Sequence, residues 1–251
     1  MSHDFSGFNI FISGAGRGLG RSTAQYLASL GATVGVGDID AAGCEETVKL
    51  IREAGGKAHG YVADLASRSE FLRVASEFSS EVGALHAVLN NASILRYAPI
   101  ESIDEQTIDL MVGAGLKTVF WGAQALLANM DSAVGGSIIN YASPVSHHGF
   151  ANASAYTAVK GAVHAVTRSM AAELGPRGVR VNAISPGSVP TPGAVAYVSQ
   201  EEYAKRAASI PLRRLGEDAD IAQAIAFLLS PNAAFVHGSV FCVDGGIVAA
   251  G

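Results

Sequence analysis

Glycine recurs at a fixed spacing just after the predicted strand Asn9–Ser13. Gly14, Gly18 and Gly20 form G-x-x-x-G-x-G, whereas the related spacing G-x-G-x-x-G fails because position 19 is Leu19. A glycine-rich run alone is also typical of a structural turn. Between a first strand and a first helix, however, glycines let the backbone turn beside a pyrophosphate, which the helix N-terminus stabilises. The segment therefore predicts a dinucleotide phosphate site.

An acidic residue follows the second predicted strand, where a dinucleotide ribose would lie. Asp38 comes roughly 20 residues after the loop, and a carboxylate there binds the ribose hydroxyls of NAD and repels the 2′-phosphate of NADP. Asp38 could instead cap the next helix, but Asp40 is better placed for that capping role. Arg17 in the loop could attract a phosphate, but Asp38 would contact the ribose directly. The sequence favours NAD(H) over NADP(H).

A second group of residues could transfer protons. Tyr156 and Lys160 are spaced i, i+4 on a predicted helix, so both side chains lie on one face. Ser143 stands upstream, at the end of the predicted strand Ser137–Tyr141. Such a tyrosine–lysine pair alone is common and is most often an ordinary surface pair.

Taken together, these motifs resemble those of the short-chain dehydrogenase/reductase family, in its compact branch of about this length. The likeness covers nearly the whole chain and lies in several motifs in the family's order, which are the Ser13–Gly20 loop, Asp38, Asp64, Asn90-Asn91-Ala92, Ser143, Tyr156 with Lys160, Asn182, Pro186-Gly187, Thr191 and Asp244-Gly245-Gly246.

The resemblance implies roles for the three polar residues. Tyr156 would be the general acid in carbonyl reduction and the general base in alcohol oxidation. A phenol ionises near 10, and the ammonium of Lys160 and an oxidised nicotinamide would both favour the phenolate. Lys160 would also hold the nicotinamide ribose. Ser143 would hydrogen-bond and polarise the substrate oxygen.

The resemblance also implies a set of cofactor contacts. Asp64 and the backbone of Leu65 would meet the adenine, Asn91 would lie beside the centre of the cofactor, and Val189 with Thr191 would hold the carboxamide. Without the family context, Asp64 would be a helix cap and the Pro-Gly pair a plain turn. The full cofactor-binding set is Gly14, Arg17, Gly18, Leu19, Gly20, Asp38, Asp64, Leu65, Asn91, Tyr156, Lys160, Pro186, Gly187, Val189 and Thr191.

Two positions depart from the family pattern. Ser93 replaces the glycine that usually follows Asn-Asn-Ala. Gly115 stands where the family has a fourth catalytic residue, an asparagine thought to maintain a helix kink whose carbonyl holds a water. Gly113 and Gly115 each weaken a helix by about 1 kcal/mol relative to alanine, so a kink could persist without the asparagine. A helix without that kink, in an impaired enzyme, is the alternative.

Strands and helices alternate along the chain. Seven strands are predicted, namely Asn9–Ser13, Ala32–Gly37, Ala58–Val62, His86–Asn90, Ser137–Tyr141, Val179–Ala183 and Ser239–Val243. Helices are predicted between successive strands. They include one that ends at about Leu30, one near Ala41–Ala54 and the longest one, around Asp104–Met130. Parallel neighbours need crossover helices. The sequence predicts an α/β fold, a single Rossmann-type domain whose doubly wound sheet of about seven parallel strands has helices on both faces.

Composition agrees with one large core. Of 251 residues, 49% are hydrophobic and 16% charged, and the net charge of -5 argues against nucleic acid as a partner. Cys44 and Cys242 have no metal-ligand spacing, which is typical of reduced thiols. Met1–Gly7 lack a secretory pattern and no apolar run reaches a membrane span, so we expect a cytoplasmic protein without a membrane partner.

The substrate is less defined. Residues 188–211 predict a lid with a short helix near Ser199–Ala208. Candidate wall residues are Ile94, Leu95, Val145, His147, His148, Phe150 and the segment around Val195–Tyr203. Most are apolar, and no arginine or lysine stands at a predictable pocket position. We expect a small uncharged alcohol or ketone, and the resemblance implies a homotetramer.

Three functions are compatible with these motifs. The first is an NAD(H)-dependent alcohol dehydrogenase or carbonyl reductase, favoured by the intact Ser143, Tyr156 and Lys160. The second is a dinucleotide-binding protein with little turnover, favoured by Gly115. A nucleotide-sugar epimerase shares the tyrosine–lysine pair but requires an added substrate domain, for which no residues remain.

Overall fold

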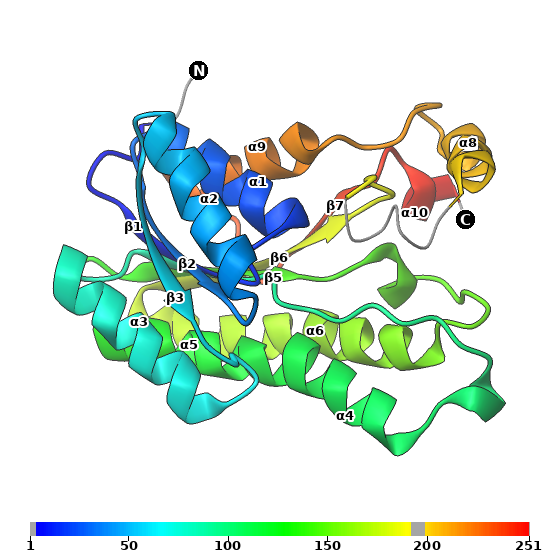
Figure 1. Ribbon diagram of the computed structural model, residues 1–251, viewed down its shortest axis with the longest axis horizontal. Coiled ribbons are helices and arrows are strands. Elements are labelled where there is room, and N and C mark those ends of the chain that lie inside the picture. The colour runs from blue at the N-terminus through cyan, green and yellow to red at the C-terminus, as the bar shows by residue number, and fades with distance from the viewer. Residues whose placement is uncertain (1–3, 192–198, 251) are drawn as a thin grey trace.

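A parallel sheet forms the centre of the molecule (Figure 1). The computed structural model describes residues 4–191 and 199–250, and within them seven strands pair in parallel in the order β3-β2-β1-β4-β5-β6-β7. They are β1 (Asn9–Ser13), β2 (Thr33–Asp38), β3 (Lys57–Val62), β4 (Ala87–Asn90), β5 (Gly136–Tyr141), β6 (Val179–Pro186) and β7 (Val240–Val243). The predicted fold class is confirmed.

Helices cover both faces of the sheet, as a doubly wound fold requires. One face carries α1 (Gly18–Ser29), α2 (Ala41–Glu53) and α9 (Asp218–Leu229), and the other carries α3 (Arg68–Val82), α5 (Thr118–Asn129) and α6 (Ser154–Leu174) (Figure 1). Strand order reverses between β1 and β4. In such sheets the ligand lies outside the carboxyl ends of the strands at this switch point.

The core packs against strands that are apolar on both sides. All five residues of β1 are buried, and the ring of Phe11 lies within 5.6 Å of Phe71 and 6.2 Å of Phe78, measured between ring centroids. Gly35 and Gly37 of β2 make room for it, since a Cβ at either would lie 2.7 Å from the Phe11 ring. Glycine inside a strand here marks a close approach by a large side chain.

The predicted helix Asp104–Met130 is interrupted. It consists of α4 (Glu105–Val112), a π-helical turn at Gly113–Lys117, and α5. The combined segment Glu105–Asn129 is long and apolar enough to cross a membrane by length and composition, contrary to the expectation from sequence, but half of its most apolar window is buried inside the protein. Because α5 packs against α3 and β4, the segment is a core helix.

Element boundaries differ modestly from prediction. Strand β6 continues three residues past Ala183 because residues through Pro186 still pair with β7, although Ser-Pro-Gly is typical of a turn. The helix predicted at Ser199–Ala208 is α8 (Gln200–Ser209), which Ser199 caps through Glu202 N. Part of the predicted lid, residues 192–198, lies outside the described residues. A short helix that we did not predict, α10 (Ile247–Ala250), follows β7.

Candidate active site

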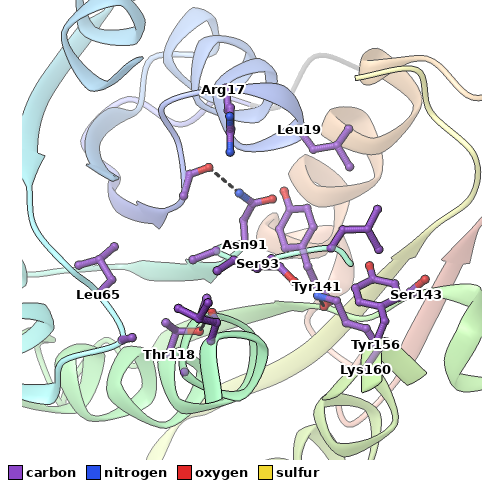
Figure 2. Close-up of a pocket in the computed structure, with 18 of the residues that line it drawn as sticks. Arg17, Leu19, Leu65, Asn91, Ser93, Thr118, Tyr141, Ser143, Tyr156 and Lys160 are labelled. Atoms are coloured by element: carbon purple, nitrogen blue, oxygen red, sulfur yellow. Dashed lines mark hydrogen bonds between the residues drawn. The ribbon is translucent and has the colours of Figure 1, made fainter. Parts of the chain in front are cut away.

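A cleft of about 1080 Å³ opens at the carboxyl ends of the strands. It is large enough for a dinucleotide together with a small substrate. Figure 2 shows Leu65 and Thr118 toward one end and Ser143, Tyr156 and Lys160 toward the other. Fourteen of the sixteen residues predicted to be catalytic or cofactor-binding line it, namely Gly14, Arg17, Leu19, Asp38, Asp64, Leu65, Asn91, Ser143, Tyr156, Lys160, Pro186, Gly187, Val189 and Thr191.

The glycine loop is held in a tightly packed turn. Gly14 and Gly18 have φ of +67° and +55°, which non-glycine residues rarely adopt. Asn91 Nδ2 donates to the carbonyl of Gly14 at 2.7 Å, so the loop after β4 fixes the loop after β1 (Figure 2). A Cβ at Gly20 would collide with the Gly14 carbonyl. Gly18 and Gly20 are not among the wall residues, and Gly20 instead permits this close packing.

Asp38 contacts the glycine loop directly. Its Oδ2 accepts from Gly16 N at 2.7 Å and its Oδ1 from Asp40 N at 3.0 Å. Asp40, not Asp38, caps α2, by accepting from Gly43 N. The Asp38 carboxylate therefore lies on the cleft wall. Arg17 lies exposed on the same wall, and its side chain has no hydrogen-bond partner among the described residues.

Ser143, Tyr156 and Lys160 converge at the other end of the cleft (Figure 2). Lys160 is 3% exposed, its Nζ donates to the carbonyl of Tyr141 at 2.6 Å, and it lies 5.7 Å from the centroid of the Tyr156 ring. Burial lowers the pKa of Lys160 to about 8. Its ammonium is thus held by a β5 carbonyl beside the phenol.

The environment keeps the Tyr156 phenol protonated in the protein without cofactor. Burial raises its pKa above the usual value, the nearby Tyr97 raises it further, and the Ser143 hydroxyl opposes both. This is the protonation state that donates a proton in carbonyl reduction. Oxidation needs the phenolate, so a further positive charge at the site would have to lower the pKa.

Buried amides connect the helix that carries Tyr156 to the sheet. Asn140 Nδ2 donates to Thr167 Oγ1 on α6 at 3.0 Å, and Asn90 Nδ2 donates to Asn140 Oδ1 at 2.8 Å. Buried polar groups paired in this way fix the position of one element on another. Sequence reasoning missed Asn140 and Thr167, although an asparagine inside an apolar strand was a visible signal.

The remaining predicted contacts lie at the two ends of the cleft. Leu65 is buried beneath the wall, and Asp64 Oδ1 accepts from Ala66 N at 3.0 Å without capping α3, whose N-cap is Ser67. At the other end, Thr191 N donates to Val189 O at 2.9 Å. A Cβ at Gly18 would lie 3.5 Å from the Thr191 side chain, so this segment closes over the glycine loop.

The long helix departs from α-helical geometry at Gly115, although the asparagine is absent. Gly113–Lys117 form the π turn, and both glycines are buried in it. A Cβ at Gly115 would lie 2.7 Å from Val159 Cγ1 and 3.4 Å from Ser93 Oγ. The two departures from the family pattern, Ser93 and Gly115, are therefore neighbours in space.

The predicted substrate wall needs correction. Ile94 and Leu95 line the cleft, but Val145, His147, His148 and Phe150 do not. Val145 is buried, Phe150 is 44% exposed, and His147 packs its ring on His164, because the turn after Ser143 directs these side chains away from the cleft.

Other side chains complete the wall near Tyr156. Tyr97, Tyr203 and Arg206 line the cleft, and sequence reasoning missed the first and the last. The sequence analysis found no arginine or lysine at a predictable position of the substrate pocket, and Arg206 on the cleft wall corrects that expectation. The i, i+3 spacing of Tyr203 and Arg206 on the predicted helix was an available signal.

Comparison with known proteins fits this geometry. The family model described as enoyl-(acyl carrier protein) reductase matches residues 14–248. The chain belongs to the short-chain dehydrogenase/reductase family. As a member of that family with alcohol dehydrogenases among its relatives, it is an oxidoreductase.

Individual members resemble the chain along nearly its whole length. Cyclohexanol dehydrogenase from Acinetobacter sp. is 37% identical over 98% of this chain and 96% of the relative. A putative short-chain alcohol dehydrogenase from Sinorhizobium meliloti superposes with a TM-score of 0.93 at 34% identity, covering 99% of each chain. A 7α-hydroxysteroid dehydrogenase solved with NADH and 7-oxo glycochenodeoxycholic acid superposes with a TM-score of 0.92 at 31% identity, covering 97% of this chain and 95% of that chain.

Proposed function

We propose that the protein is an NAD(H)-dependent dehydrogenase that interconverts a small secondary alcohol and its ketone. The observation that carries the proposal is the meeting of Ser143, Tyr156 and Lys160 on the wall of the cleft that begins at the glycine loop. The left-handed turn at Gly14 on the cleft wall and the N-terminus of α1 behind it suit the pyrophosphate of a dinucleotide. A bound nicotinamide supplies hydride transfer to or from the carbinol carbon.

The protein residues handle the proton and the substrate oxygen. In alcohol oxidation, the Tyr156 phenolate takes the hydroxyl proton as the carbon loses hydride, and in reduction the phenol returns it. Ser143, which is 9% exposed beside the phenol, donates a hydrogen bond to the substrate oxygen and stabilises its developing charge. Lys160, held by Tyr141 O, orients the nicotinamide ribose and favours the phenolate.

Asp38 supports the choice of NAD(H). Its carboxylate is anchored to the loop at Gly16 N, next to where the adenosine ribose would lie. A 2′-phosphate would meet this negative charge at close range. The NADH in a related structure supports the same choice.

Expectations on compartment, assembly, lid and partners also belong to the proposal. The protein is a cytoplasmic homotetramer, residues 188–211 form the lid over the substrate, and neither nucleic acid nor membrane is a partner. Side chains of α5 and α6 would form one two-fold interface and β7 with α9 the other.

The decisive experiment follows NADH absorbance with a panel of cyclic and acyclic secondary alcohols and their ketones, each with NAD(H) and with NADP(H). We expect turnover of at least one pair with NAD(H). Tight NADH binding without turnover of any pair would instead support a dinucleotide-binding protein.

A further inference from the structure

Two polar side chains of α8 line the cleft beyond Tyr156, and they indicate which chemical groups a substrate could carry there. Tyr203 and Arg206 lie one helical turn apart on α8 and line the same cleft as Tyr156. A role for them in substrate binding rests on the proposed function, because they belong to that same site.

The hydroxyl of Tyr203 has no hydrogen-bond partner among the residues that the structure describes. The residue is 9% exposed, and its oxygen is buried without a hydrogen bond to any residue in 4–191 or 199–250. An unpaired buried hydroxyl costs about 1–3 kcal/mol, so nearly all such groups are satisfied in proteins or by ligands. The Tyr203 hydroxyl therefore indicates a polar ligand atom at this wall.

Arg206, one helical turn further along α8, has donor nitrogens that no described residue uses. Its Nε donates to Glu202 Oε1 at 3.1 Å, and its side chain is 37% exposed. Nη1 and Nη2 have no hydrogen-bond partner among the described residues. Glu202 thus fixes the guanidinium through one nitrogen and leaves the outer donors, whose planar geometry matches a carboxylate.

Tyr97 connects this group to the catalytic tyrosine. Its ring meets that of Tyr156 edge to face, with centroids 6.2 Å apart. Burial raises the pKa of Tyr97, and the positive charge of Arg206 opposes this shift, so the cation lies within electrostatic reach of Tyr97. One wall of the cleft therefore leads from the Tyr156 hydroxyl along Tyr97 to Arg206.

We propose that Arg206 and Tyr203 form a subsite for a carboxylate on the substrate, at the end remote from the reacting carbon. A small hydroxy acid or oxo acid would place its alcohol or ketone oxygen at Ser143 and Tyr156. Its apolar middle would lie against Tyr97 and its carboxylate would accept from Arg206 and Tyr203. This replaces the uncharged substrate expected from sequence, which could not place Arg206 in the cleft.

The test compares two probes of the same shape, 4-hydroxycyclohexanecarboxylate and its neutral carboxamide, as substrates with NAD. The wild type should use the acid with a kcat/KM at least about tenfold higher, which corresponds to about 1.4 kcal/mol. Arg206→Gln should bring this ratio close to one, and Arg206→Lys should retain part of it. Tyr203→Phe should lower the ratio by a smaller factor.

The matched control is Lys205→Gln. Lys205 is the neighbouring cation on α8, pairs with Glu201 at 2.9 Å and is not on the cleft wall. Its removal changes the net charge by the same amount as Arg206→Gln but should leave the acid-to-amide ratio as it is in the wild type. If the acid-to-amide ratio fell equally in Lys205→Gln and Arg206→Gln, the preference for the acid would depend only on the overall charge, and the subsite would be overturned.

The experiment distinguishes failure of the subsite from failure of the proposed function. If the amide or plain cyclohexanol turns over while the acid has no advantage, the enzyme proposal stands and the subsite is wrong. If no probe turns over, the function fails, and calorimetric binding of 4-oxocyclohexanecarboxylate and its amide to the protein, with and without NADH, still decides the subsite. Tighter binding of the acid that Arg206→Gln abolishes would support the subsite, and equal binding would overturn it.

Discussion

The backbone of Gly115 packs directly against the side chain of Val159, on the face of α6 that also carries Tyr156. A Cβ at position 115 would lie 2.7 Å from Val159 Cγ1, closer than real Cβ atoms approach another carbon. Glycine is therefore part of the packing between the π turn and α6. The π turn itself persists, which favours an enzyme adapted to glycine over one impaired by it.

Gly115→Asn should harm the protein. Overpacking costs about 1–3 kcal/mol, which exceeds the gain of about 1 kcal/mol from removing a helical glycine. We expect a lower free energy of unfolding in urea and a lower kcat. Val159→Ala in the same chain removes Cγ1 and should recover part of both losses. An increase in kcat for Gly115→Asn alone would identify the wild type as an impaired enzyme.

Asp38 should determine the cofactor. We expect a preference for NAD(H) over NADP(H) in kcat/KM of at least about tenfold, or about 1.4 kcal/mol. Asp38→Asn removes the charge but retains an oxygen that can accept from Gly16 N, so it should narrow the preference without loosening the loop. Asp38→Ala should narrow it and also weaken NADH binding, measured by fluorescence titration. If the wild type preferred NADP(H), the cofactor preference would depend on attraction of the 2′-phosphate by Arg17 and not on Asp38.

Lys160 should make stability depend on pH. Burial lowers its pKa from 10.5 in the unfolded chain to about 8 in the folded protein. Between these values the unfolded state binds more protons, so the contribution of Lys160 to stability rises with pH in that window. Below pH 8 the lysine is charged in both states and the cost of burying its charge is fully present.

The measurement compares wild type with Lys160→Met by urea unfolding without cofactor at pH 7.5 and 9.5. The free energy of unfolding of the wild type should rise by about 1–2 kcal/mol relative to that of the variant between pH 7.5 and 9.5, since one pKa unit corresponds to about 1.4 kcal/mol. The comparison cancels the other titrating groups. A constant difference between the two proteins would mean that burial does not lower the pKa of Lys160, because the lysine would then be charged in both the folded and the unfolded state over this interval.

Assembly can be tested through exposed aromatic residues on the two proposed interfaces. Phe120 on α5 is 40% exposed and Phe241 on β7 is 39% exposed. Phe120→Glu and Phe241→Glu should each convert a tetramer to a dimer, and the double variant should be monomeric, by light scattering at micromolar concentration. A monomeric wild type would contradict the tetramer.

Local signals in the sequence were sufficient for the fold and for much of the wall. The strand β1, the glycine spacing and the position of Asp38 depend on short segments whose residue types suit one conformation. The π turn was less accessible, because it depends on how Gly115 meets Val159 from another helix.

Side-chain directions in loops were not predictable. His147 and Phe150 closely follow Ser143 in sequence but turn away from the cleft, whereas Arg206 reaches it from a helix more than sixty residues after Ser143. Such placements depend on tertiary packing. The same limit explains why Arg206 on the cleft wall was missed.

Tyr156→Phe tests the chemistry most directly. It removes only the phenolic oxygen, whereas the edge contact with Tyr97 and the position of Lys160 involve the ring and the sheet. We expect kcat to fall about 100- to 10,000-fold, the usual contribution of proton transfer, while NADH binding changes little. Lys160→Ala is the contrasting variant, since it should lower both turnover and NADH affinity.

The pH profile gives a second, independent test of Tyr156. Oxidation needs the phenolate, so kcat/KM for the alcohol should rise with pH. Reduction needs the phenol, and because burial keeps the pKa of Tyr156 high, kcat/KM for the ketone should stay level near neutral pH and fall only in alkali. Tyr156→Phe should abolish both dependences. Wild-type turnover by Tyr156→Phe on a confirmed substrate would show that another group transfers the proton.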